Sequence, residues 1–310
     1  MSKKDDIKDK IIFPTSSAKD FSKKLSQISQ IKLGKIFIKK FPCQEKYIRL
    51  IDEVKERTLY ICALFSKNVD EILMEIFLIA NAAKLAQAKE INLILPYLFY
   101  SRQDKKTGKD FREPISAKLL AELFKKAGIK KVITVHLHSQ RIFKFYQGIE
   151  LLNIETPQIF AKKLKKIVKN FSNFCIVAPD KGALNDCKKL SLFLGKIDVF
   201  FFEKKREEFK KKRRVKILKF QGDVEGKNII LFDDIIDTGE TVIQAKKKLD
   251  KMKAKKVFLC VTHALFSKNA YQKIKRAKFS KIIVSDTIPL KKESKEIEVV
   301  SLIDKIARHL

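Results

Sequence analysis

The sequence predicts an α/β protein built from two domains, each with a mostly parallel sheet. Its 310 residues exceed the usual size of one domain, about 100–150 residues. Apolar runs of strand length alternate with stretches of helical spacing, and this alternation occurs in two series. A strand–helix–strand order makes neighbouring strands parallel, because each right-handed crossover returns the chain to the same edge of the sheet. We place the domains at residues 1–154 and 155–310, with the boundary near the segment NIETPQIF.

The first series alternates apolar runs with amphipathic stretches. In chain order we expect a strand at 58–65, a helix at 68–88, a strand at 91–99, a helix at 112–128 and a strand at 131–138. Pro114 is expected in the first turn of the second helix and Gly128 just past its end, the positions that these residues favour.

The second series repeats the pattern. We expect strands at 173–180, 197–205, 227–234 and 256–266, with helices at 182–195 and 241–252. In open parallel sheets, ligands bind beyond the carboxyl ends of the strands. The loops that follow the predicted strands are therefore the places to look for chemistry.

The formal charge of +32 raises the question of nucleic-acid binding. Only ten of the 68 basic residues are arginine, and the lysines are spread along the whole chain. A nucleic-acid site is more often a local patch in which arginine and aromatic residues are interleaved. We therefore expect no nucleic-acid partner, although a positive field attracts phosphorylated small molecules.

Other features of the composition indicate a globular protein of a reducing compartment. Hydrophobic residues make up 45% of the chain, which is typical of a folded domain. No apolar run reaches the roughly 18 residues of a membrane helix, and the charged N-terminus resembles no secretory signal. The five cysteines are scattered and form no CxxC pair. We expect a cytoplasmic location without membrane contact.

The segment ILFDDIIDTGETV, residues 230–242, combines acids with a turn rich in hydroxyl groups. Asp233 and Asp234 end a predicted strand, and a turn into a helix follows that contains Asp237, Thr238, Gly239 and Thr241. Backbone N–H groups at a helix N-terminus bind phosphate, and threonine hydroxyls add donors. The aspartates would repel that phosphate, so they suit the hydroxyls of a sugar that carries it, or a divalent metal. This pattern predicts a cradle for ribose 5-phosphate. Helix capping by Asp237 and Thr238 is the alternative, but it leaves the aspartate pair unexplained.

This segment resembles the 5-phosphoribosyl 1-pyrophosphate loop of type I phosphoribosyltransferases and ribose-phosphate pyrophosphokinases. A phosphoribosyltransferase would need only one α/β domain. Residues 96–124, PYLFYSRQDKKTGKDFREPISAKLLAELF, resemble the signature of the pyrophosphokinases, and the N-terminal IIFPTSSAKDFSKKL resembles their first segment. The segments APDKGA, QGDVEGK, VTHALFS and SDTIPL continue the match in order. The chain is thus identified as similar to the ribose-phosphate pyrophosphokinases along essentially its whole length.

The resemblance implies two tandem phosphoribosyltransferase-like domains, with ATP bound by the N-terminal one and ribose 5-phosphate by the C-terminal one. It also implies transfer of the diphosphoryl group of ATP to the 1-hydroxyl of ribose 5-phosphate, which gives 5-phosphoribosyl 1-pyrophosphate and AMP. Mg²⁺ is the implied cofactor. Catalysis of this type depends mostly on positioning and on neutralising negative charge.

Several residues match positions that contact ATP in the family. Arg102, Gln103 and Asp104 follow a predicted strand end, where arginine can grip phosphate or stack on adenine. Phe41 and Glu45, in FPCQE, match an adenine-contacting loop that reaches in from a neighbouring subunit. The resemblance therefore implies a homo-oligomer, at least a dimer. The alternative for Phe41 is a core aromatic residue.

The resemblance assigns metal contacts to His138 and Asp180. His138 matches a histidine associated with Mg–ATP, and its alternative is a buried core histidine. Asp180, in APDKGA, belongs to a turn that binds around the ribose and the pyrophosphate, where the amides of Lys181, Gly182 and Ala183 suit phosphate. His136 and Gln147 depart from the family, which has aspartate at both positions. Imidazole is a poor Mg²⁺ ligand compared with carboxylate.

The charged segment FFFEKKREEFKKKRR, residues 200–214, matches a mobile catalytic loop of the family. Lys204 and Arg206 match its Lys-x-Arg pair and are the predicted catalytic residues. Cations on a closing loop can stabilise the charge of a transition state. A charge run is otherwise simply a solvated face.

A catalytically silent regulatory paralogue that binds an active synthetase is the alternative function. Such a chain would be expected to lose either the Lys-x-Arg pair or the pair Asp233 and Asp234. Both pairs are present. We therefore expect an active enzyme.

Overall fold

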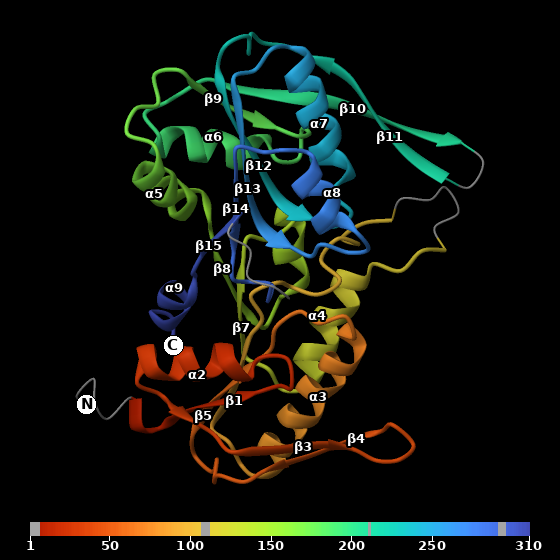
Figure 1. The fold of residues 1–310 in the computed structure, drawn as a ribbon. Coiled ribbons are helices and arrows are strands. Elements are labelled where there is room, and N and C mark those ends of the chain that lie inside the picture. The colour runs from red at the N-terminus through yellow and green to blue at the C-terminus, as the bar shows by residue number, and fades with distance from the viewer. Residues whose placement is uncertain (1–6, 107–111, 210–211, 291–295) are drawn as a thin grey trace. The chain divides into compact units, whose positions relative to one another are not determined.

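The computed structural model describes residues 7–106, 112–209, 212–290 and 296–310, and the side chains of these residues except 204–218. The chain folds into two compact units (Figure 1). Unit 1 runs to Ile154 and also contains Thr287–Pro289 and Leu302–Leu310. Unit 2 contains Glu155–Asp286 and Leu290–Ser301. Within the part of the chain so described, no helix has the length and apolar composition needed to cross a membrane.

Unit 1 is built on a six-stranded sheet in which every pair of neighbouring strands is parallel. Its order is β2 (Lys32–Leu33), β1 (Lys10–Pro14), β5 (Thr58–Cys62), β6 (Glu90–Ile94), β7 (Lys131–Val135) and β8 (Glu150–Ile154). The helical elements are α2 (Lys19–Ser29), α3 (Val69–Leu85), α4 (Ser116–Lys126), the 3₁₀ helix η1 (Gln140–Phe145) and α9 (Ile303–Ala307). The central strands are continuous apolar runs because both faces of a parallel sheet are buried.

A separate hairpin, β3 (Ile36–Lys40) and β4 (Lys46–Leu50), forms its own two-stranded antiparallel sheet in unit 1. Figure 1 shows it beside α3, and β4 packs against that helix. A two-stranded hairpin is only marginally stable by itself, so its placement depends on the helix.

The last residues of the chain belong to unit 1 because they bond to its sheet. The carbonyl oxygen of Leu310 accepts hydrogen bonds from Lys10 Nζ at 2.8 Å and from the Tyr60 hydroxyl at 3.1 Å. The predicted single boundary after residue 154 does not anticipate this return of the chain.

Unit 2 is built on a seven-stranded sheet that is parallel except at one edge. Its order is β11 (Lys212–Phe220), β10 (Val199–Phe209), β9 (Phe174–Ala178), β12 (Asn228–Ile236), β13 (Lys256–Ala264), β14 (Lys281–Ser285) and β15 (Ile297–Val300). Its helices are α5 (Pro157–Ile167), α6 (Leu184–Phe193), α7 (Glu240–Lys251) and α8 (Ala270–Arg276).

Two apolar clusters cover the two faces of the unit 2 sheet. Cys175 and Val177 of β9 belong to the cluster that α7 and α8 complete. Ile176 and Ala178 belong to the cluster that α5 and α6 complete. Successive residues of a strand point to opposite faces, so an unbroken apolar run serves both clusters at once.

The predicted α/β class with mostly parallel sheets is confirmed, but several predicted element ends are wrong. The strands β5, β6 and β7 end at Cys62, Ile94 and Val135, three to five residues before the predicted ends. The helix α4 begins at Ser116, so Pro114 precedes it instead of lying in its first turn. Gly128 lies past the end of α4 with φ of +89°, as expected.

The charged part of β10, from Glu203 to Phe209, differs most from expectation. The strand continues to Phe209 and pairs antiparallel with β11, so residues expected to form a loop form a β-hairpin. Apolar residues recur through VKILKF in β11, a strand pattern that the surrounding charge obscures.

Candidate active site

The loop after β6 carries Arg102, Gln103 and Asp104, and it is tied to the start of α4. The carbonyl oxygen of Gln103 accepts a hydrogen bond from Ala117 N at 3.2 Å, and its Oε1 accepts one from Ser116 Oγ at 2.5 Å. Arg102 is exposed, whereas Asp104 is only 8% exposed. Arg102 can therefore reach a ligand, while Gln103 and Asp104 hold the loop in place.

The loop after β7 meets the loop after β6 through an ion pair. Arg141, in the first turn of η1, lies 3.8 Å from Asp104 between Nη1 and Oδ2. Ser139 caps this turn by accepting a hydrogen bond from Arg141 N at 3.2 Å. The loops that carry Asp104 and His138 are thus joined at the carboxyl edge of the sheet.

His138 lies three residues past the end of β7 and is exposed, so it is not a core histidine. His136 is buried, with a backbone φ of +45° and its N–H donating to the carbonyl of Ile154 at 3.0 Å. An imidazole offers no oxygen ligand for Mg²⁺, and this one is also buried. Gln147, at the other departure, is exposed.

Two residues at this edge have left-handed backbone conformations that are unusual outside glycine. Tyr100 has φ of +58° and His136 has φ of +45°. Such strain persists only where the surrounding contacts impose it, and it is concentrated at ligand sites. One of these contacts is the hydrogen bond from the Tyr100 hydroxyl to Asp70 in the first turn of α3.

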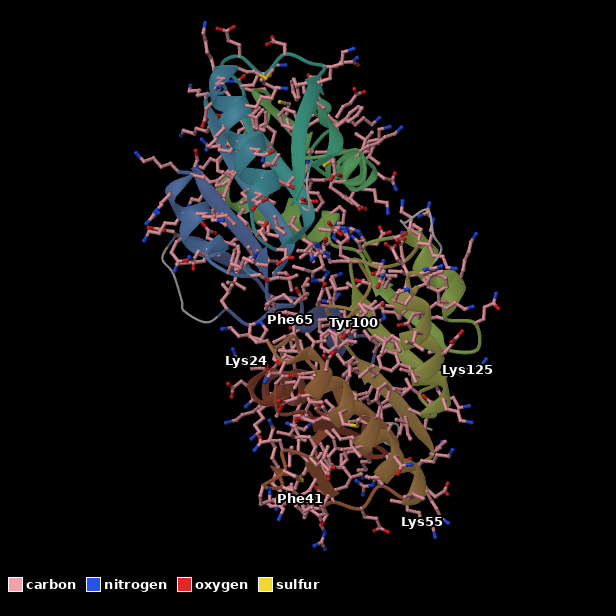
Figure 2. The ribbon with its side chains drawn as sticks, turned by 90° about the vertical axis from the view of Figure 1, so that its right-hand side faces the viewer. Lys24, Phe41, Lys55, Phe65, Tyr100 and Lys125 are labelled. Carbon is pink, nitrogen blue, oxygen red and sulfur yellow. The ribbon has the colours of Figure 1, made fainter. Side chains whose placement is uncertain are left out.

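Phe41 and Glu45 lie on the β3–β4 hairpin, and both are exposed, so Phe41 is not a core aromatic residue. Figure 2 shows Phe41 at one end of unit 1, with Phe65 and Tyr100 at the other end. A single copy of the chain therefore does not bring Phe41 together with the Arg102 loop.

In unit 2, Asp233 and Asp234 lie within β12, which continues two residues past them to Ile236. The pairing of β12 with β9 ends at Leu231, whereas its pairing with β13 continues through Asp233 to Ile236. Asp233 and Asp234 are half-buried, and Asp233 Oδ1 accepts a hydrogen bond from Asp234 N at 3.0 Å. The strand thus carries its acids past the end of β9, at the carboxyl edge of the sheet.

The turn from β12 into α7 has the geometry of an anion site. Gly239 is the N-cap with φ of +76°, and as a glycine it supplies no side-chain cap. Asp237 and Thr238 therefore precede the N-cap position, and the first amides of α7 have no acceptor within the helix. A Cβ atom on Gly239 would lie 3.1 Å from two carbon atoms of Ile274, so the turn requires glycine for its conformation and its packing. Thr238 and Thr241 are half-buried beside it.

Asp180 follows β9, the neighbour of β12, and its carboxylate closes a turn. Its Oδ1 accepts hydrogen bonds from Gly182 N at 2.8 Å and from Ala183 N at 3.3 Å. Asp180 thus engages two of the three amides that the sequence predicts to suit phosphate. Within the described residues, no three His, Cys, Asp or Glu side chains gather as a metal site.

Comparison with known proteins identifies the family. Sequence models of the N-terminal domain of ribose phosphate pyrophosphokinase and of the phosphoribosyl synthetase-associated domain match residues 10–128 and 203–308. The chain is 33% identical to the ribose-phosphate pyrophosphokinase of Campylobacter jejuni, over 94% of the chain and 91% of that protein. The chain belongs to the ribose-phosphate pyrophosphokinase family. The same enzyme of Mycoplasma genitalium is 34% identical over 96% of the chain and 89% of its own length.

A solved structure supports the same family. The crystal structure of phosphoribosylpyrophosphate synthetase from Mycobacterium smegmatis matches with a TM-score of 0.86 and 27% identity, and it covers 97% of each chain. The ribose-phosphate pyrophosphokinases are diphosphotransferases, so membership confirms the predicted class of enzyme.

The predicted catalytic pair of this pyrophosphokinase chain lies in β10. The backbones of Lys204 and Arg206 pair with Ile217 and Val215 of β11, whereas their side chains lie outside the described residues. Sequence reasoning missed Arg141 and Tyr100, which hold the Arg102 loop. A signal for Arg141 was available in its place three residues after His138.

Proposed function

We propose that the chain transfers the β,γ-diphosphoryl group of ATP to the 1-hydroxyl of ribose 5-phosphate, giving 5-phosphoribosyl 1-pyrophosphate and AMP. The observation that carries this proposal is the end of β12, where two acids precede the N-terminus of α7 with glycine at its N-cap. An anion site beside paired carboxylates fits a sugar phosphate better than it fits a simple anion or a simple polyol. The relatives named above support the same reaction.

Ribose 5-phosphate is assigned to unit 2. The first amides of α7 and the hydroxyls of Thr238 and Thr241 would hold the 5-phosphate. Asp233 and Asp234 would accept hydrogen bonds from the sugar hydroxyls, and Asp237 would complete the turn. Different groups would thus contact the phosphate and the sugar hydroxyls. The acids lie near the end of β12, and the amides lie at the start of α7.

ATP is assigned to unit 1. Arg102 and His138 are exposed at the carboxyl edge and would contact the nucleotide, with Gln103 and Asp104 holding the loop. Phe41 and Glu45 would contact the adenine bound by another copy of the chain. At least a dimer is therefore required for a complete nucleotide site.

Mg²⁺ would be held mainly by the phosphates of ATP, with His138 and Asp180 as the proposed protein contacts. This fits the common mode of Mg²⁺ binding, in which one or two carboxylates supplement phosphate and water oxygens. The ion would neutralise phosphate charge. The oxygen of the 1-hydroxyl attacks the β-phosphorus, its proton is released, and the bond from the β-phosphorus to the bridging oxygen of AMP breaks. Lys204 and Arg206 would stabilise the charge on the transferred group.

The deciding experiment incubates the purified chain with ATP, ribose 5-phosphate and Mg²⁺ and follows AMP. We expect AMP only when all three are present. AMP release without the sugar would contradict the proposal, and so would the absence of AMP under every condition. ATP binding without turnover would instead favour the regulatory paralogue.

A further inference from the structure

A fully buried glutamate joins three elements of unit 1. Glu75, on α3, is 0% exposed. Its carboxylate accepts hydrogen bonds from Ser16 N at 2.7 Å, from Ser16 Oγ at 2.8 Å and from Lys46 Nζ at 2.5 Å. Burying a carboxylate is costly unless it is paired and hydrogen-bonded, and each of these partners meets that need. Through Glu75, β4 is tied both to α3 and to the loop after β1.

The partner of Glu75 lies at the base of the hairpin loop. Lys46 follows Glu45 directly, and its side chain is 10% exposed. Its Nζ also lies 3.3 Å from Glu71. Burial acts to lower the pKa of Lys46, but the bonds and charges of Glu75 and Glu71 raise it above its usual value, so this lysine is charged. Lys40, opposite Lys46 in the hairpin, reaches Glu71 at 2.9 Å.

The hairpin loop between Lys40 and Lys46 is short, and backbone hydrogen bonds close it. Phe41 N donates to the carbonyl of Glu45, and Gln44 N donates to the carbonyl of Phe41, both at 2.8 Å. Gln44 has φ of +74°, as in hairpin loops that combine a turn with one left-handed residue. The positions of Phe41 and Glu45 are therefore fixed relative to Lys46.

The outer face of the hairpin offers no comparable anchor among the described residues. Phe37 is 47% exposed and Tyr47 is 37% exposed, and both line an open groove of about 860 Å³ beside α2. The inner face contains half-buried residues such as Ile38 and Ile48, and β4 packs on α3. Apolar contacts tolerate sliding, whereas a buried ion pair selects one register. The Lys46–Glu75 pair is a buried ion pair between β4 and α3 of the kind that selects a register.

We propose that Lys46 and Glu75 are positioning residues of the nucleotide site: their buried ion pair orients the loop that presents Phe41 and Glu45 to ATP held by a second copy of the chain. This inference rests on the proposed function. It assigns a role in substrate binding to two residues that do not themselves touch the nucleotide.

The test compares Lys46→Met with Lys40→Met. Lys46→Met removes the buried partner and leaves Glu75 its two bonds from Ser16. The KM for ATP should rise on the order of tenfold, while kcat and the KM for ribose 5-phosphate stay within about twofold. Lys40→Met removes the half-exposed pair on the same face and should change the KM for ATP by less than about twofold. Lys46→Arg keeps the charge and should recover most of the affinity.

A merely structural role would produce a different pattern. A loss of folded protein lowers the maximal rate and leaves the KM for ATP unchanged, and that result would overturn the inference. ATP affinity is measured by calorimetry alongside the kinetics, so a chain that binds ATP without turnover still answers the question. If the unaltered chain releases AMP and Lys46→Met binds ATP equally well, the inference fails and the proposed function stands. If the unaltered chain neither binds ATP nor releases AMP, both fail.

Discussion

The Tyr100 hydroxyl donates a hydrogen bond to Asp70 and thereby joins the loop after β6 to the first turn of α3. Tyr100 has a left-handed backbone, so this bond acts on a strained residue two positions before Arg102. The bond to Asp70, helped by partial burial and the charge of Asp70, raises the pKa of Tyr100 above its usual value of 10.0. The neutral phenol is the form that the folded protein favours.

We predict that Tyr100→Phe raises the KM for ATP about threefold, because the loop that carries Arg102 loses an anchor. The free energy of unfolding should fall by only about 0.5 kcal/mol, since Tyr100 is 44% exposed and water competes for the bond. Because folding raises the pKa of Tyr100, the bond stabilises the folded protein at every pH below the pKa of the unfolded chain. This stabilisation is lost as the pH rises through the pKa of the folded protein. The difference between the two proteins should thus be present at pH 7 and disappear above about pH 10.

Asp70→Ala provides the control for this interaction. It should have the effect of Tyr100→Phe, and the double variant should add little to either, because both changes remove the same bond. Fully additive effects on the KM for ATP would show that the two residues act independently.

The separation of Phe41 from the Arg102 loop leads to a prediction about mixed oligomers (Figure 2). Phe41→Ala and Arg102→Ala should each reduce activity strongly when tested alone. Mixed subunits should regain activity, up to about a quarter of that of the unaltered protein, because random pairing restores one intact site in some interfaces. The measurement is the rate of AMP release after co-refolding of the two variants. If the mixture is no more active than its components, Phe41 and Arg102 do not serve one site across two copies.

The sequence predicts the parallel sheets well because their strands are unbroken apolar runs, buried on both faces. It predicts the acids of β12 at the correct edge for the same reason. It does not predict that β12 continues to Ile236, although the two isoleucines after Asp234 are compatible with a longer strand. The extra pairing comes from β13, which is itself longer than β9. The sequence of β12 alone does not indicate how long its partner strand is.

The contacts that hold the candidate sites are less predictable. Lys46 and Glu75 are 29 positions apart in the sequence. From the sequence, each would be predicted to lie on the exposed face of its own strand or helix. Their burial follows from the packing of the hairpin on α3, a tertiary contact without a local signal. The pair of Asp104 and Arg141 likewise joins two loops that only the sheet order brings together.

Gly239 provides a test of the turn before α7. Gly239→Ala should lower the free energy of unfolding by about 1–2 kcal/mol, because alanine is strained at the left-handed φ that this turn requires. The added carbon would also press on Ile274. If the turn shifts to relieve the strain, the KM for ribose 5-phosphate should rise while the KM for ATP stays constant. Gly195→Ala is the control, since Gly195 has φ of +95° with open space around it and lies away from the predicted cradle. It should be destabilising without affecting either KM.

The last prediction concerns Lys204 and Arg206, whose backbones lie in β10. If their charges act on the transition state, replacing either with alanine should lower kcat far more than it weakens ATP binding, because only interactions that are stronger in the transition state accelerate the reaction. Loss of one such contact costs on the order of 100- to 1000-fold in rate. Lys210, Lys211 and Lys212 are matched controls in the same charged segment, and each should be nearly neutral when replaced with alanine. Equal and modest effects at all five positions would mean that this segment is only a charged surface.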